Sequence, residues 1–139
     1  YNGDGFGGGL VLVSSDGDAE VAGQPVEYDT FGGGLYYSPE SLPATFSVSY
    51  DTIDPSVGAD ATSLLVGADW EVGPGTLHVA YQNADVDDNS DLTDTKGYEV
   101  AYSYPVNDSV TVMPGIFSVE ETDGTNDDTG IVVETKFSF

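Results

Sequence analysis

The side chains of this 139-residue chain that could do chemistry are mostly carboxylates. One segment, residues 85–91, places oxygen ligands at alternate positions, as calcium-binding loops do. Its candidate metal ligands are Asp85, Asp87, Asn89 and Asp91. An EF-hand loop would need Gly where Ser90 stands and Glu where Lys96 stands. The segment therefore predicts no more than weak Ca²⁺ or Mg²⁺ binding, against the simpler interpretation of an acidic surface loop, and no other cofactor is expected.

Catalytic chemistry finds little support in the sequence. His78 is the single histidine and there is no cysteine, so a zinc site lacks ligands. Serine and aspartate are abundant, but the G-x-S-x-G pattern of a nucleophile elbow is absent. We therefore expect no enzymatic activity and interpret His78 as a polar residue that lines an interior.

Asp69 and Glu71 are two residues apart and would share one face of a β-strand. They make a poor catalytic pair, because both lie on one strand with no facing partner. Acids that line a water-filled lumen instead favour the passage of cations, even where they are merely solvated. The candidate pore-lining residues are Asp69, Glu71, His78, Glu99, Glu134 and Lys136.

The charge balance excludes some partners. The chain has a net charge of -23, with Lys96 and Lys136 as its only cations. Such a chain repels nucleic acid. It has no apolar run of the length that a transmembrane helix needs, although a spanning β-strand requires only about 10 residues with alternate ones apolar.

Period-2 alternation recurs along the whole chain, whereas helical periodicity is absent. In one strand Phe46, Val48 and Tyr50 alternate with small polar residues. The sequence predicts eight strands, at residues 5–14, 29–38, 44–51, 63–72, 76–83, 96–104, 109–119 and 130–139. A five-residue motif, Phe6–Leu10, returns at Phe31–Leu35, either by chance in a glycine-rich chain or as a duplicated hairpin.

The connections between these strands alternate between long and short. The long ones, at residues 15–28, 52–62, 84–95 and 120–129, hold most of the acids. Short turns on one side and long loops on the other are the arrangement of an outer-membrane barrel. Residues 1–139 are therefore predicted to form a single barrel segment of four hairpins, with short periplasmic turns and long, acidic extracellular loops.

Aromatic residues gather near the predicted strand ends. Those near the short turns include Tyr37, Trp70 and Tyr104. Outer-membrane barrels carry such aromatic girdles at the two membrane interfaces. The alternative is the core of a soluble β-sandwich, where aromatics would concentrate in mid-strand.

Residues 102–117 combine an aromatic strand, a short Asn/Asp turn and a strand that contains Pro-Gly. In this pattern the last two hairpins resemble those of Gram-negative porins. The final strand resembles the outer-membrane assembly signal, which ends in an aromatic residue with apolar residues at alternate positions before it. The matching residues are Ile131, Val133, Phe137 and Phe139, with Thr135 as a departure.

This resemblance implies an all-β fold: a transmembrane, antiparallel, up-and-down barrel of roughly 16 strands, of which eight lie here. It implies an outer-membrane, homotrimeric porin for small hydrophilic solutes and ions. Membrane lipid, lipopolysaccharide and the barrel assembly machinery are its expected partners. The inward acids predict a cation preference. Two alternatives stay open: a complete eight-stranded structural or adhesin-like barrel, and a secreted, acidic, calcium-binding β-sandwich.

Overall fold

The computed structural model describes residues 2–3, 5–21, 24–56, 58–87, 94–121 and 127–138. These residues form β-strands and their connections. The strands are β1 (Asn2–Gly3), β2 (Phe6–Val21), β3 (Gln24–Tyr37), β4 (Ala44–Pro55), β5 (Ala61–Val72), β6 (Gly75–Val86), β7 (Thr95–Asn107), β8 (Val110–Glu121) and β9 (Asp128–Phe137). In the described part of the chain, no helix has the length and hydropathy of a membrane span.

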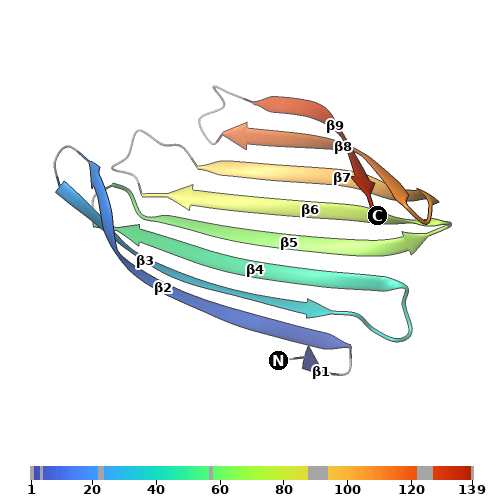
Figure 1. Ribbon diagram of the computed structural model, residues 1–139, viewed down its shortest axis with the longest axis horizontal. Helices are drawn as coiled ribbons and strands as arrows, with labels where there is room; N and C mark the ends of the chain where they lie inside the picture. The colour runs from blue at the N-terminus through green and yellow to red at the C-terminus, as the bar shows by residue number, and fades with distance from the viewer. Residues whose placement is uncertain are drawn as a thin grey trace.

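All strands belong to one antiparallel sheet, in which each strand pairs with the next in the order β1 to β9. Figure 1 shows this sheet as a curved, twisted wall, with β1 and β9 at its opposite edges. The turns after β1, β3, β5 and β7 lie at one end of the strands, and β2, β4, β6 and β8 end at the opposite end (Figure 1). This is the predicted up-and-down arrangement.

Strands β2 to β9 confirm the eight predicted strands, with two differences. The two-residue strand β1 was not predicted; it pairs with the start of β2 through a turn in which Gly5 has a φ of 78°. Residues 15–28 were predicted as a long loop, but the β2–β3 ladder continues to the pair Val21–Gln24. A backbone ladder needs no apolar side chains, so acidic residues can continue it wherever water solvates them.

Strand alternation gives the sheet two chemically different faces. The apolar face carries Phe46, Val66 and Val79, for example, and the polar face carries Thr45, Asp69 and His78. Residues paired directly across neighbouring strands lie on the same face, so the register fixes each face over the whole sheet. We use the names apolar face and polar face below.

The sheet has almost no core. Ala44 and Ala101, at 7% and 3% exposure, are the buried hydrophobic residues among those described. The chain exposes 9629 Å², whereas a soluble globular domain of this mass would expose about 6,900 Å². Within the described residues there is one sheet and no second layer against it, so the β-sandwich alternative is wrong.

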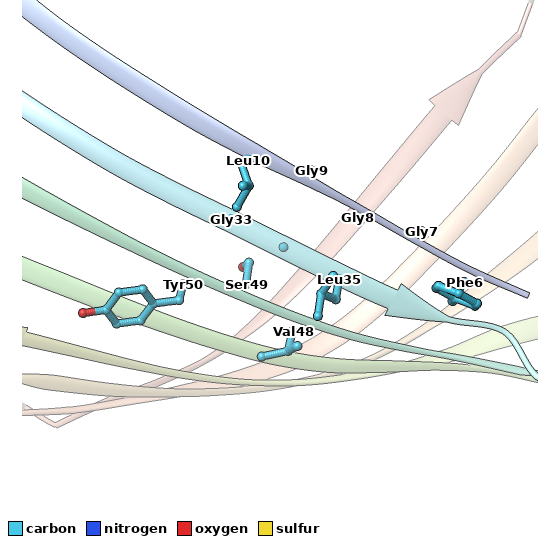
Figure 2. A pocket seen from close by; sticks show the side chains of 11 residues that line it. Phe6, Gly7, Gly8, Gly9, Leu10, Gly33, Leu35, Val48, Ser49 and Tyr50 are labelled. Carbon is cyan, nitrogen blue, oxygen red and sulfur yellow. The ribbon is translucent and has the colours of Figure 1, made fainter. Parts of the chain in front are cut away.

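The repeated glycine motif now has a structural explanation. Its two copies pair with each other in the β2–β3 ladder, with Gly8 opposite Leu35 and Leu10 opposite Gly33. A Cβ atom on Gly8 would lie 2.5 Å from Leu35 Cδ2, and one on Gly33 would lie 2.7 Å from Leu10 Cδ2. Each leucine therefore occupies the space that its partner glycine leaves. Figure 2 shows Leu10 beside Gly33 in a hollow of ≈ 700 Å³ that lies mainly on the apolar face.

Candidate pore-lining face

The six residues predicted to line a pore all lie on the polar face. They come from strands β5, β6, β7 and β9, and Asp69 and His78 among them form a direct cross-strand pair. The clearest row runs from Asp69 through His78, Ala101 and Gly115 to Val132. Alternation within each strand places these candidates on one side, and the hairpin registers bring those sides together.

Within this row His78 contacts Asp69. The Nδ1–H group of His78 donates to Asp69 Oδ1, and the contact becomes an ion pair when the ring is protonated. Both side chains stay open to water, at 34% and 54% exposure. The geometry comes from the two-residue turn Gly73–Pro74, where Gly73 has the positive φ of 61° that a type II′ hairpin turn requires. This turn pairs Val72 with Gly75 and so sets Asp69 opposite His78.

The remaining charged candidates occupy other levels of the polar face. Glu71 lies opposite Thr76, close to the short turns, and Glu99 lies between Ala80 and Phe117 near mid-strand. On β9, Glu134 and Lys136 are two residues apart and pair with Met113 and Thr111. Both glutamates on β7 and β9 are exposed. Carboxylates therefore extend across the face, and Lys136 is the lysine that shares it within the described residues.

The predicted assembly signal and aromatic girdle lie on the opposite, apolar face. In β9, Ile131, Val133 and Phe137 are 80%, 62% and 59% exposed, and Phe139 lies outside the described residues. The girdle residues Tyr37, Trp70 and Tyr104 are also exposed; they belong to the short-turn halves of their strands. An exposed apolar surface of this size needs lipid or protein to cover it.

The candidate metal loop is described only in part. Asn89 and Asp91 lie outside the described residues. Asp85 accepts a 2.7 Å hydrogen bond from Asn83 Nδ2, and the amide of Asp87 donates to the backbone carbonyl of Asp60 at 2.9 Å. The described residues contain no group of three or more potential metal ligands. Weak loop-bound Ca²⁺ or Mg²⁺ stays a prediction.

Electrostatic repulsion concentrates beside this loop. The pKa of Asp60 is raised, first by the charge of Asp54, then by desolvation, and further by the charge of Asp87 and a side-chain hydrogen bond with Asp54. The connection after β4 and the end of β6 thus bring like charges together. Each additional proton or cation bound there relieves that repulsion.

Apolar residues on the polar face are the feature that sequence reasoning missed. Leu65, Phe117 and Val119 line a hollow of ≈ 240 Å³ there, together with Gln82 and Glu99. Alternation alone could place each residue on a face, but it could not show that they meet. Their meeting depends on the register across four strands, and the connection at residues 87–94 is too long to fix that register from its length.

Comparisons with known proteins agree with this geometry. A family model described as Gram-negative porin matches residues 1–134. No curated protein matches the chain. Among solved structures, the anion-selective porin from Comamonas acidovorans matches with a TM-score of 0.79 at 14% sequence identity, over 100% of this chain and 47% of that one. At this identity the likeness shows the fold alone, and the chain spans about half the length of that porin.

The barrel wall, its two faces and the family match support one conclusion. The open order of the sheet and the half-length match also favour the partial barrel over the complete eight-stranded one. The chain belongs to the Gram-negative porin family, whose proteins lie in the bacterial outer membrane.

Proposed function

We propose that the whole protein is a passive, water-filled outer-membrane channel for small hydrophilic solutes and ions, and that this chain supplies about half of its wall. The polar face would line the water and the apolar face would meet lipid. The family and the fold point to a channel rather than to an enzyme. Short turns then lie on the periplasmic side and the acidic connections on the extracellular side.

The observation that carries the proposal is the set of carboxylates on the polar face. Asp69, Glu71 and Glu134 would each cost several kcal/mol if they were buried without partners. All three are exposed. A wide aqueous lumen keeps them hydrated, whereas the interior of a closed eight-stranded barrel is filled by side chains.

We further propose that the channel prefers cations. The carboxylates of the polar face exceed its cationic groups, which among the described residues are Lys136 and, when protonated, His78. Rings of acids raise the local concentration of cations in a pore. The porin from Comamonas acidovorans is anion-selective, but at 14% identity the likeness shows the fold alone and carries no information on the side chains that set selectivity.

The apolar face supports proposals about partners. Ile131, Val133 and Phe137 would present the assembly signal to the barrel assembly machinery, and the aromatic girdle would lie at the periplasmic interface of the bilayer. Lipopolysaccharide would surround the outer half of the barrel. We also propose a homotrimer, which is implied by resemblance to the family. Cross-linking of the purified full-length protein in detergent tests it, and a monomer would contradict it.

The experiment for the channel is electrical recording from the full-length protein in planar bilayers. In a KCl gradient the reversal potential should show a permeability for K⁺ greater than that for Cl⁻. No conductance would contradict the channel, and a clear anion preference would contradict the selectivity.

A matched pair of variants separates lumen charge from overall charge. Neutralising Asp69 and Glu99 on the polar face should lower the preference for K⁺. Neutralising Asp29 and Asp85, whose registers place them on the apolar face, removes the same charge. This second change should shift the reversal potential less, because those carboxylates lie outside the lumen. Equal shifts would contradict the assignment of the faces.

A further inference from the structure

The hollow on the polar face spans strands β5 to β8 and has a volume of ≈ 240 Å³. Two adjacent rows of cross-strand pairs form it. One row is Ala80–Glu99–Phe117, and the other is Leu65–Gln82–Gly97–Val119. Tyr98 and Ser118, from the apolar face, complete the lining.

Small residues make the floor of this hollow. A Cβ atom on Gly97 would meet only Gln82 Cβ, at 3.7 Å, so the space above Gly97 is open. Phe117 forms one wall, since its ring lies over Gly130 of the neighbouring strand, where an added Cβ would be 2.5 Å from Cζ. The aromatic ring replaces the side chain that Gly130 lacks, which is a common way to stabilise a glycine in a sheet.

The lining combines two chemistries. Leu65, Phe117 and Val119 are 39%, 36% and 36% exposed on the face that also carries the carboxylates. Glu99 lies beside Phe117 and is exposed as well. No lysine lines the hollow, and Asp128 lies next to Val119 at the end of one row. The site is thus apolar with a negative rim.

A ligand that fits these features has a hydrocarbon group and one positive charge. The hydrocarbon group would cover the exposed apolar side chains, which is favourable because it removes apolar surface from water. An ammonium group would meet the Glu99 carboxylate and contact the face of the Phe117 ring by a cation–π interaction. Anions are repelled, and inorganic cations gain nothing from the apolar wall.

We propose that this hollow is a weak binding site for small organic monocations that carry a hydrocarbon group, such as primary aromatic amines. This binding site rests on the proposed function, because it assumes that the polar face lines the channel. The site deepens that function by naming a class of solute. Binding there would slow such amines in transit and partly block the current of smaller ions.

The test is channel block by phenethylammonium in recordings from the full-length protein. Ethylammonium and neutral phenylethanol are the matched probes, lacking the ring and the charge respectively. Phenethylammonium should block at concentrations at least about five-fold lower than either one. Glu99→Gln and Phe117→Ala should each weaken its block by about three- to ten-fold. Phe117→Leu keeps the bulk over Gly130 and should still weaken the block, which guards against misfolding of the alanine variant.

Glu134→Gln is the matched control. It removes the same charge from the polar face, but Glu134 pairs with Met113 and does not line the hollow. This variant should change ion selectivity while leaving the affinity for phenethylammonium within about two-fold. Equal weakening by Glu134→Gln and Glu99→Gln would overturn the site in favour of a diffuse charge effect.

The outcomes separate the site from the channel. If the channels conduct but phenethylammonium blocks them no better than ethylammonium does, the binding site is overturned and the channel function stands. The same result is expected if another segment of the protein fills the hollow, and it overturns the site in that case too. Absence of any conductance would overturn the channel instead. Saturation-transfer NMR of phenethylammonium with the detergent-solubilised protein then decides: a signal lost in Glu99→Gln supports the site, and no signal overturns it.

Discussion

Gly75 lies where neighbouring groups approach the start of β6 closely. A Cβ atom there would be 2.2 Å from the carbonyl oxygen of Ser103 and 2.8 Å from the ring of Tyr102. The Tyr102 hydroxyl donates a 2.7 Å hydrogen bond to the Val72 carbonyl, which ties β7 to the turn between β5 and β6. Gly75 and Tyr102 thus set how closely β5, β6 and β7 pack at the short-turn end.

We expect Gly75→Ala to destabilise the folded barrel by about 1–3 kcal/mol, because the backbone of Ser103 cannot move without breaking its ladder. Urea unfolding of the full-length protein in lipid vesicles measures this free energy. Gly97→Ala is the control, since its new Cβ would make an ordinary contact at 3.7 Å. An equal loss of unfolding free energy in the two variants would show that the close approach of the Ser103 backbone is not the cause.

The contact between Asp69 and His78 predicts how a charge at position 78 affects selectivity. His78→Lys would place a permanent positive charge opposite the Asp69 carboxylate. That charge should lower the preference of the channel for K⁺. Reversal potentials measure the change, and His78→Asn, which adds no charge, is the control. An equal change in the two variants would exclude an effect of charge beside Asp69.

At the scale of elements, the connection between β4 and β5, at the end of the strands opposite the short turns, carries electrostatic repulsion. The connection between β4 and β5 packs against the end of β6 through the backbone bond from Asp87 to Asp60. It also brings the carboxylates of Asp54, Asp60 and Asp87 together, which raises the pKa of Asp60. The hairpin registers therefore hold these like-charged carboxylates together against their mutual repulsion.

The raised pKa of Asp60 sets the sign of a pH effect. The folded chain binds the proton more tightly than the unfolded chain, so this stabilising contribution is full at low pH and is lost as pH rises through the folded pKa. Amide hydrogen exchange at residues 58–61 should thus be slower at acidic pH, after correction for intrinsic exchange rates. Asp60→Asn should remove this dependence. Asp108→Asn, in a turn at the opposite end, should leave the pH dependence of exchange intact. Loss of this dependence in both variants would show that it does not arise from Asp60.

The sequence predicted the strands well but the contacts between them only in part. Alternation placed Asp69, Glu99 and Glu134 correctly on one face, because side chains in a strand have a strict period of two. The pairing of Asp69 with His78 also follows from the two-residue turn at Gly73–Pro74, although it was not drawn from the sequence. The hollow around Gly97 could not be predicted, since longer connections leave the register free. Acidic residues in the β2–β3 ladder were mistaken for loop because charge is rare in ordinary strands.

At the scale of the whole molecule, the two edges of the sheet do not meet. β1 pairs only with β2, and β9 only with β8, within the described residues. Each edge presents backbone donors and acceptors that a bilayer cannot satisfy. A barrel closes such edges by pairing them with further strands.

We therefore expect residues 1–139 alone not to form a closed, monomeric barrel. The full-length protein should give a heat-modifiable band on a cold denaturing gel, and the isolated segment should not. Refolding of both into the same detergent provides the comparison. A compact, heat-modifiable monomer from the segment would instead favour the complete eight-stranded barrel.

The neighbour-only pairing of the strands has an evolutionary consequence. Contacts between described elements join only consecutive strands, and no layer packs across the sheet. Loss or duplication of one hairpin would therefore require new pairing at one seam and no repacking of an interior. The circumference of such a wall can change in steps of two strands. The motif Phe6–Leu10 and its repeat at Phe31–Leu35 lie on the two strands of one hairpin, so they are not copies of a whole hairpin.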